Sequence, residues 1–160
     1  MISPSKRYWL GIDPGAKGFA CVRDDAGNMD WCPLAETAAM MQLLRQLSGH
    51  VVMCMVEDVH AMPHQGVTSS FNFGKGLGKV LGWLEALDIP YTQVTPNRWQ
   101  KTMWLRGDRV AGSPKKTSLN AATRLHPGVD WRRSEDCKVP DDNKADATLI
   151  CDYCKFTHQQ

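Results

Sequence analysis

The sequence lacks a hydrophobic run that could cross a membrane. Every apolar stretch ends before the roughly 20 residues that a spanning helix needs. The N-terminus also lacks a positively charged segment followed by an apolar one, the pattern of a secretory signal peptide. We therefore expect a protein with no membrane partner, located in the cytoplasm.

Disulfide and zinc patterns are lacking too, although the chain contains six cysteines. The cysteines do not follow the short, regular spacing of a small secreted scaffold, so we expect reduced thiols. Cys151, Cys154 and His158 resemble half of a zinc site. The second half is missing, because only Cys137 and His126 remain as complements, and we do not expect bound zinc.

A phosphate-binding glycine motif is also absent. Gly74, Gly78 and Gly82 are spaced four apart in a stretch with helical character, which matches neither the Walker nor the dinucleotide pattern. We therefore expect no nucleotide cofactor. Each glycine costs up to about 1 kcal/mol relative to alanine in a helix. Close approach by another backbone, from the sheet, a second subunit or a nucleic acid, would explain the row.

The net charge is only +2, but the charges are segregated along the chain. Basic residues outnumber acidic ones between positions 97 and 133, where they are Arg98, Lys101, Arg106, Arg109, Lys115, Lys116, Arg124, Arg132 and Arg133. This asymmetry indicates a polyanionic partner. A solvated basic face without a ligand is the alternative interpretation.

Length and periodicity predict one α/β domain over residues 1–160. A chain of this length buries about two-thirds of its unfolded surface. Apolar runs predict strands, the first three forming an antiparallel meander, and helical spacing or a Ser/Thr-Pro start predicts helices. The expected strands cover 10–12, 18–23, 28–34, 51–56 and 89–94, and the expected helices cover 37–47, 71–83, a segment from 96, 115–125 and 142–153. A polar loop is expected at 61–70.

Two carboxylates are predicted at strand ends. Asp13 follows a short apolar strand that Pro14-Gly15 terminates, and Glu57 follows the apolar run 51–56. A carboxylate at the rim of a sheet can bind a hard divalent cation, which prefers oxygen ligands. For Asp13 the alternative is an ordinary turn in which the side chain binds its own backbone. For Glu57 the alternative is a charged residue that only ends a strand.

A second acidic pair lies on the last helix. Asp142 and Asp146 are four residues apart, hence on one helix face, where two like charges repel unless a cation neutralises them. Favourable placement of acids at a helix N-terminus is the alternative. That alternative explains Asp142 better than Asp146, whose side of the helix is otherwise apolar.

Five short motifs then resemble, in order and spacing, the RuvC-type Holliday junction resolvases of the RNase H-like superfamily. They are Gly11-Ile12-Asp13-Pro14-Gly15, Val56-Glu57-Asp58-Val59, Gly74-Lys75-Gly76-Leu77-Gly78, Val94-Thr95-Pro96-Asn97-Arg98-Trp99 and Lys144-Ala145-Asp146-Ala147. The similarity spans nearly the whole chain, and the compact length resembles that of a phage-encoded member. That origin would place the protein in the cytoplasm of a bacterial or phage-infected cell.

The resemblance implies an RNase H-like fold, a mixed five-stranded sheet flanked by helices, working as a homodimer on four-way DNA. It also implies that Asp13, Glu57 and Asp146 are catalytic metal ligands. Family members place the fourth ligand three or four residues before the last Asp, which here means Asn143 or Asp142. We choose Asp142 because it has a carboxylate.

The resemblance also suggests DNA contacts. Lys116 resembles a catalytic lysine near the scissile phosphate, and Lys101 or Arg98 resembles another. The family's aromatic wedge falls at His60 here, and Phe71 or Phe73 could replace it. The full set of expected DNA-binding residues is His60, Phe71, Phe73, Lys75, Arg98, Lys101, Arg106, Arg109, Lys115 and Lys116.

Four converging carboxylates suit a site for two Mg²⁺ or Mn²⁺ ions that activate water for phosphodiester hydrolysis. The expected function is therefore metal-dependent, paired cleavage of four-way and other branched DNA. The alternatives are a related nuclease for RNA–DNA hybrids or structured RNA, and a junction-binding protein without catalysis. An actin-like phosphotransferase is a third alternative, although 160 residues are short for its two lobes.

Overall fold

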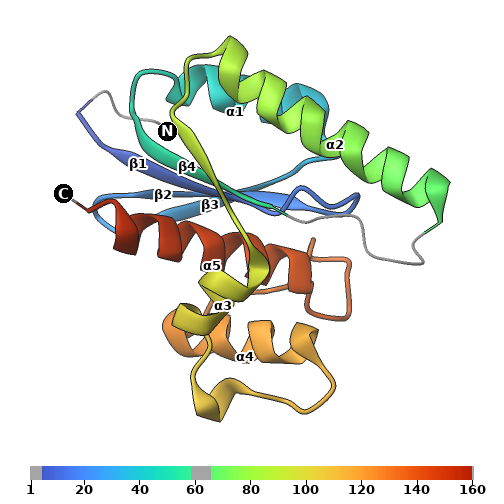
Figure 1. Cartoon of the computed structure of the whole chain (residues 1–160). Coiled ribbons are helices and arrows are strands. Elements are labelled where there is room, and N and C mark those ends of the chain that lie inside the picture. The colour runs from blue at the N-terminus through green and yellow to red at the C-terminus, as the bar shows by residue number, and fades with distance from the viewer. Residues whose placement is uncertain (1–4, 59–65, 160) are drawn as a thin grey trace.

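The computed structural model describes residues 5–58 and 66–159 (Figure 1). These residues form five strands, five α-helices and one short 3₁₀ turn, η1; three strands come first, and α3, η1, α4 and α5 follow one another at the end. The strands are β1 (Tyr8–Ile12), β2 (Phe19–Asp24), β3 (Met29–Pro33), β4 (Val51–Glu57) and β5 (Tyr91–Val94). The helical elements are α1 (Thr37–Leu47), α2 (Val67–Ala86), α3 (Pro96–Met103), η1 (Arg106–Asp108), α4 (Pro114–Leu125) and α5 (Asp142–Thr157).

The strands form one mixed sheet in the order β3-β2-β1-β4-β5. The first three strands are antiparallel neighbours, as predicted, whereas β4 and β5 join parallel to β1 and to each other. Ile12 is paired with Val56 across β1 and β4. Asp13 directly follows β1 and Glu57 is the last residue of β4, so the two acids emerge side by side where these neighbouring strands end.

Helices cover both faces of the sheet (Figure 1). Helices α1 and α2 lie over one face, where Leu10 and Ile12 pack with Met40 and Leu44. Helix α5 packs across β1, β2 and β4 on the other face, and α4 packs against α5. Both sheet faces are thus buried, which is typical of strands as apolar as β1 and β4.

Gly11 allows α5 to approach β1 closely. A Cβ atom at this position would lie 2.2 Å from the backbone nitrogen of Cys151 on α5, a distance no side chain tolerates. The glycine in the first motif therefore has a packing role. It sets the distance between the strand that carries Asp13 and the helix that carries Asp146.

The sequence located most elements, but several boundaries differ. The expected helix 37–47 is confirmed as α1, and Ser113 caps α4 by accepting a hydrogen bond from the Lys116 backbone nitrogen at 3.4 Å. Thr95 stands at the N-cap of α3 without a side-chain capping bond. Helix α2 begins at Val67, so residues 67–70 of the expected loop are helical, because each residue added to a formed helix gains a backbone hydrogen bond.

The sheet does not explain the glycine row of α2. A Cβ atom at Gly74, Gly78 or Gly82 would meet nothing within 4 Å, so these positions face open space. Of the explanations raised above, approach by the sheet is therefore wrong. A second subunit and a nucleic acid remain.

The cysteines are free thiols, and all except Cys137 are buried. The Cys151 thiol donates to the carbonyl of Trp9 at 3.2 Å, and the Cys154 thiol donates to that of Met53 at 3.4 Å. These two side chains therefore bind separate strands. No helix within the described ranges is long and apolar enough to span a membrane.

Candidate active site

The fold brings the four predicted acids into one electrostatic cluster. Asp13 and Glu57 come from the ends of β1 and β4 and are each only 8% exposed. The negative charge of Asp142 raises the pKa of Asp13. The charges of Asp13, Glu57 and Asp142 all raise the pKa of Asp146. We call Asp13, Glu57, Asp142 and Asp146 the acidic cluster.

Burial and mutual repulsion disfavour ionisation of this cluster. Burial raises the pKa of Asp13 to about 6, and the charges of Asp142 and Asp141 add to that effect. The pKa of Glu57 is raised to about 7 by burial and then by the charge of Asp13. Burial also raises the pKa of Asp146 well above its ordinary value. Such carboxylates become fully ionised near neutral pH only at an energetic cost, which a bound cation would relieve.

Each of three carboxylates is held by a neutral hydrogen-bond donor from a different segment. The backbone N–H of Gly15 donates to Asp13 Oδ1 at 3.1 Å, so the turn considered as an alternative is present together with the cluster. The indole Nε1 of Trp99 on α3 donates to Glu57 Oε1 at 2.8 Å. The hydroxyl of Ser118 on α4 interacts with the Asp146 carboxyl and favours its ionised form, which partly offsets the effect of burial on its pKa.

Sequence reasoning missed Trp99 and Ser118 as parts of the site. Trp99 ended one of the motifs that carried the resemblance, which was the only signal for it. Ser118 lies inside an ordinary amphipathic helix. Both side chains are buried, so only the packing of α3 and α4 reveals what they contact.

The two candidates for the fourth ligand have different surroundings at the start of α5. Asp141 caps the helix by accepting from the Asn143 backbone nitrogen at 2.9 Å, and it also accepts from the Asn143 side chain at 2.8 Å. Arg133 Nε donates to the other oxygen of Asp141 at 2.7 Å. The side-chain amide of Asn143 therefore binds Asp141, the residue that caps the helix. The charge of Asp142, in contrast, acts on both Asp13 and Asp146.

The first turn of α4 places Lys115 at the cluster. Its Nζ lies 3.3 Å from Asp142 Oδ2. Lys116, the residue predicted to act near the phosphate, is exposed and lines a hollow of about 310 Å³ together with Trp131 and Pro140.

The donor set suits a hard divalent cation. All four side chains of the cluster offer carboxylate oxygens, and Asp146 Oδ1 is buried without a hydrogen-bond partner. Within residues 5–58 and 66–159, however, no three His, Cys, Asp or Glu side chains are already grouped tightly enough to hold a metal ion. The residues therefore fit the chemistry of the ion, although their ligand geometry is not preassembled.

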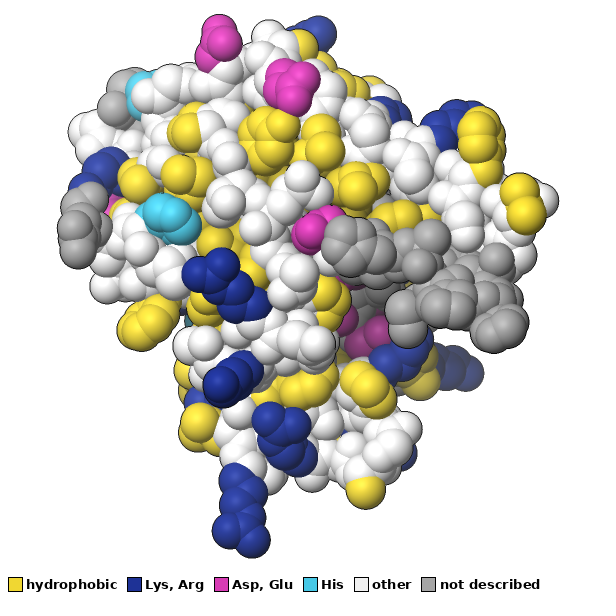
Figure 2. All heavy atoms as spheres, in the orientation of Figure 1, with side chains coloured by type: hydrophobic (Ala, Val, Ile, Leu, Met, Phe, Trp, Pro, Cys, Tyr) yellow, Lys and Arg dark blue, Asp and Glu magenta, His cyan; other side chains and the backbone are white. Residues whose placement is uncertain are grey.

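The other predicted DNA contacts lie mainly on the helices below the sheet. Dark-blue basic side chains gather over that part of the molecule in Figure 2, where Figure 1 places α3 and α4. The exposed members of the predicted set are Phe71, Lys75, Arg98, Lys101, Arg106, Arg109, Lys115 and Lys116. The predicted wedge position His60 lies outside the described residues.

Some residues of the basic segment form ion pairs with acidic side chains of the same chain. Arg124 forms a bidentate pair with the buried Asp108, which also accepts from the Leu105 backbone nitrogen at 2.8 Å. This pair fixes the turn that exposes Arg106 and Arg109. Arg132 and Arg133 likewise pair with Asp130 and Asp141.

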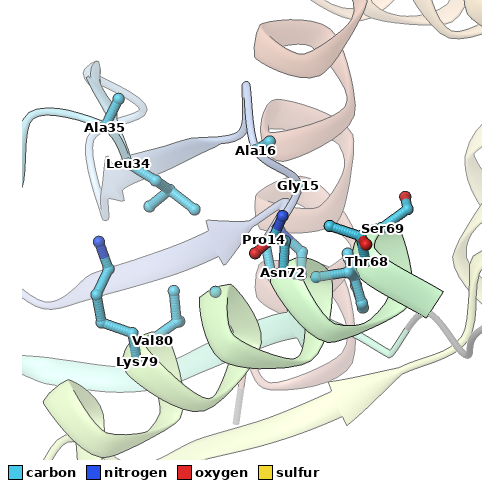
Figure 3. Close-up of a pocket in the computed structure, with 12 residues that line it drawn as sticks. Pro14, Gly15, Ala16, Leu34, Ala35, Thr68, Ser69, Asn72, Lys79 and Val80 are labelled. Atoms are coloured by element: carbon cyan, nitrogen blue, oxygen red, sulfur yellow. The ribbon is translucent and has the colours of Figure 1, made fainter. Parts of the chain in front are cut away.

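A hollow of about 700 Å³ adjoins the Asp13 turn (Figure 3). It lies between Pro14–Ala16, the segment Leu34–Ala35, and α2 from Thr68 to Val80. Phe73 lines this hollow, whereas Phe71 is 69% exposed. Of the two phenylalanines predicted as wedge candidates, Phe71 is the one that projects into solvent.

Comparison with solved structures shows the fold. A structure of RuvC from Thermus thermophilus in complex with a Holliday junction substrate has a TM-score of 0.56 and 12% identity, over 91% of this chain and 90% of that one. A second Thermus thermophilus RuvC structure has a TM-score of 0.55 and 16% identity, over 94% and 97%. The yeast mitochondrial Holliday junction resolvase Ydc2 is more distant, with a TM-score of 0.46 and 16% identity, over 94% and 78%.

No family model and no curated protein sequence matches this chain. The two RuvC structures confirm the predicted RNase H-like α/β fold, with its mixed five-stranded sheet flanked by helices. At 12% and 16% identity the likeness is one of fold.

Proposed function

We propose that this protein is a metal-dependent endonuclease that cuts four-way DNA junctions in paired nicks. The observation that carries the proposal is the acidic cluster, in which Asp13, Glu57 and Asp146 are held by neutral donors at the edge of the sheet. The fold shared with a junction-bound RuvC supports the choice of substrate.

The proposed ligands of Mg²⁺ or Mn²⁺ are the four carboxylates of the acidic cluster. When bound, the ions would activate water and stabilise the leaving oxygen of a phosphodiester. The chain's own residues orient these ligands: Gly15, Trp99 and Ser118 each hold one carboxylate through a neutral donor. Lys115 stands beside Asp142, where its ammonium can stabilise negative charge on a phosphate.

The basic side chains of α3 and the η1 turn are proposed to bind the phosphate backbone. Arg98, Lys101, Arg106 and Arg109 are exposed. Such contacts position a duplex without reading its bases, so they suit an enzyme that selects DNA by structure.

A homodimer is proposed through the open face of α2. Val67 and Phe71 are 86% and 69% exposed, and the nearby glycines offer a helix surface without side chains. Small residues allow two helices to approach closely, and a two-fold pair would present two sites to opposing strands.

The test is cleavage of a labelled mobile four-way junction with Mg²⁺ or Mn²⁺, beside a flap, a fork, linear duplex and an RNA–DNA hybrid. Symmetric paired nicks that disappear in Asp146→Asn are the expected result. Preferential cleavage of the hybrid would favour the RNase H-type alternative. Tight junction binding without cleavage by the wild-type protein would favour a binding module.

A further inference from the structure

Glu57 receives its hydrogen bond from a side chain that is completely buried. Trp99 is 0% exposed, and its Nε1 lies 2.8 Å from Glu57 Oε1. The two residues are 42 positions apart in the sequence, on β4 and α3. The contact therefore depends on the packing of α3 beside the sheet edge.

The orientation of the Trp99 ring is fixed by its neighbours. Trp104 meets it edge-on, with ring centroids 5.8 Å apart and an interplanar angle of 84°. Trp99 also belongs to the core cluster that includes Val94 at the end of β5 and Ala145 on α5. With the ring held on several sides, the indole N–H has one available direction, toward Glu57.

The donor is neutral, and this matters for a site that collects negative charge. A lysine or arginine at position 99 would neutralise Glu57 and compete with a bound cation. An indole N–H fixes one carboxylate oxygen while the group keeps its charge. Partners of this kind orient metal ligands in proteins, and their removal typically weakens metal binding about 10- to 100-fold.

We propose that Trp99 is a positioning residue for the metal site: its indole N–H holds Glu57 Oε1 so that the carboxylate faces the divalent cation in one orientation. This inference rests on the proposed function. It goes further by assigning a role to a residue outside the acidic cluster.

The competing explanation is that Trp99 only fills the core. Trp131 provides a matched control, because it belongs to the same core cluster and is 6% exposed. Its Nε1 is buried without a hydrogen-bond partner among the described residues. Trp131→Phe therefore removes an indole N–H that holds no carboxylate, at a similar loss of ring volume.

The experiment compares the wild-type protein with Trp99→Phe, Trp131→Phe and a protein carrying β-(3-benzothienyl)alanine at position 99. The last replacement exchanges the indole N–H for sulfur and keeps the ring size, so it remains informative if Trp99→Phe does not fold. Mn²⁺ affinity is measured from the electron paramagnetic resonance signal of free Mn²⁺. Thermal unfolding in a chelator reports the fold, and junction cleavage supplies kcat and KM.

Both changes at position 99 are expected to weaken Mn²⁺ binding about 10- to 100-fold, with KM for the junction unchanged. Trp131→Phe is expected to keep the wild-type Mn²⁺ affinity, even where it lowers the melting temperature. Wild-type Mn²⁺ affinity in the benzothienyl protein, or an equal loss in Trp131→Phe, overturns the positioning role alone. A wild-type protein that neither binds Mn²⁺ nor cuts any junction overturns the proposed function and this inference together.

Discussion

Lys115 Nζ lies 3.3 Å from Asp142 Oδ2, so a cation of α4 contacts the first acid of α5. The Lys115 side chain is 76% exposed, and an exposed pair of this kind contributes little to stability. Its ammonium group is therefore a solvent-accessible positive charge beside the acidic cluster. The adjacent Lys116 faces a different hollow.

Lys115→Ala is predicted to lower the rate of junction cleavage by at least about 10-fold, because one cation that stabilises phosphate charge is lost. Lys116→Ala is the matched control and should lower it much less. Single-turnover cleavage at saturating protein separates this effect from weaker DNA binding. Equal rate losses in the two variants would contradict the assignment of Lys115.

Asp146→Asn is predicted to stabilise the metal-free protein at pH 8 while abolishing cleavage. Asp146 Oδ1 is buried without a partner, and burial raises the pKa of this carboxyl, so its ionisation opposes folding. The neutral amide removes that penalty, and each 1 kcal/mol gained raises the melting temperature by about 2–4 °C in a chain of this size. Calorimetry in a chelator measures the shift, with the exposed Asp136→Asn as control. A lower melting temperature for Asp146→Asn would refute the prediction.

The metal-free protein is predicted to lose stability as the pH rises from about 4 to 7. The pKa of Asp13 is raised to about 6 and that of Glu57 to about 7, whereas both groups ionise near pH 4 in the unfolded chain. Below pH 4 both are protonated in either state and contribute no penalty. Between the unfolded-state pKa of each group and its higher folded-state pKa, the unfolded chain is ionised while the folded chain still holds the proton, so the free energy of unfolding falls as the pH rises. Above pH 7 the groups are ionised in both states, and the loss of stability is constant.

Urea unfolding across this pH range measures that trend. Glu57→Gln should flatten the slope between pH 5 and 7. Asp130 provides a contrast. Its hydrogen bonds with Arg132 lower its pKa to about 2, so its contribution to the stability of the fold is lost only in acid. A slope that is unchanged in Glu57→Gln would show that other groups cause the trend.

Gly78→Leu is predicted to leave the fold intact but to weaken self-association. A side chain at this position meets nothing within 4 Å in the chain, and leucine is a better helix former than glycine by up to about 1 kcal/mol. The melting temperature should therefore stay the same or rise, while sedimentation shows a shift toward monomer. Gly49→Ala, at a positive φ of 82°, is the contrasting change and should destabilise the fold instead. Undiminished self-association of Gly78→Leu would exclude the α2 interface.

The segments that carry the acidic cluster could be predicted from the sequence. The strand that ends at Asp13-Pro14-Gly15, the run that ends at Glu57 and the helix that carries Asp142 and Asp146 are local patterns, and periodicity is enough to identify them. The structure confirmed these elements with small shifts at their ends, since helix ends depend on contacts beyond the local sequence. The basic segment was found from the distribution of charged residues along the sequence.

Only the tertiary structure decided which groups meet. The parallel register that aligns Ile12 with Val56 places Asp13 beside Glu57, and the close packing of α5 on Gly11 adds Asp146. The contacts of Trp99 with Glu57 and of Lys115 with Asp142 depend on the positions of α3 and α4. Local spacing sets the face of each helix, but the packing of helices on the sheet determines what that face touches. The sequence therefore named the acids, whereas long-range packing determined how each one is held.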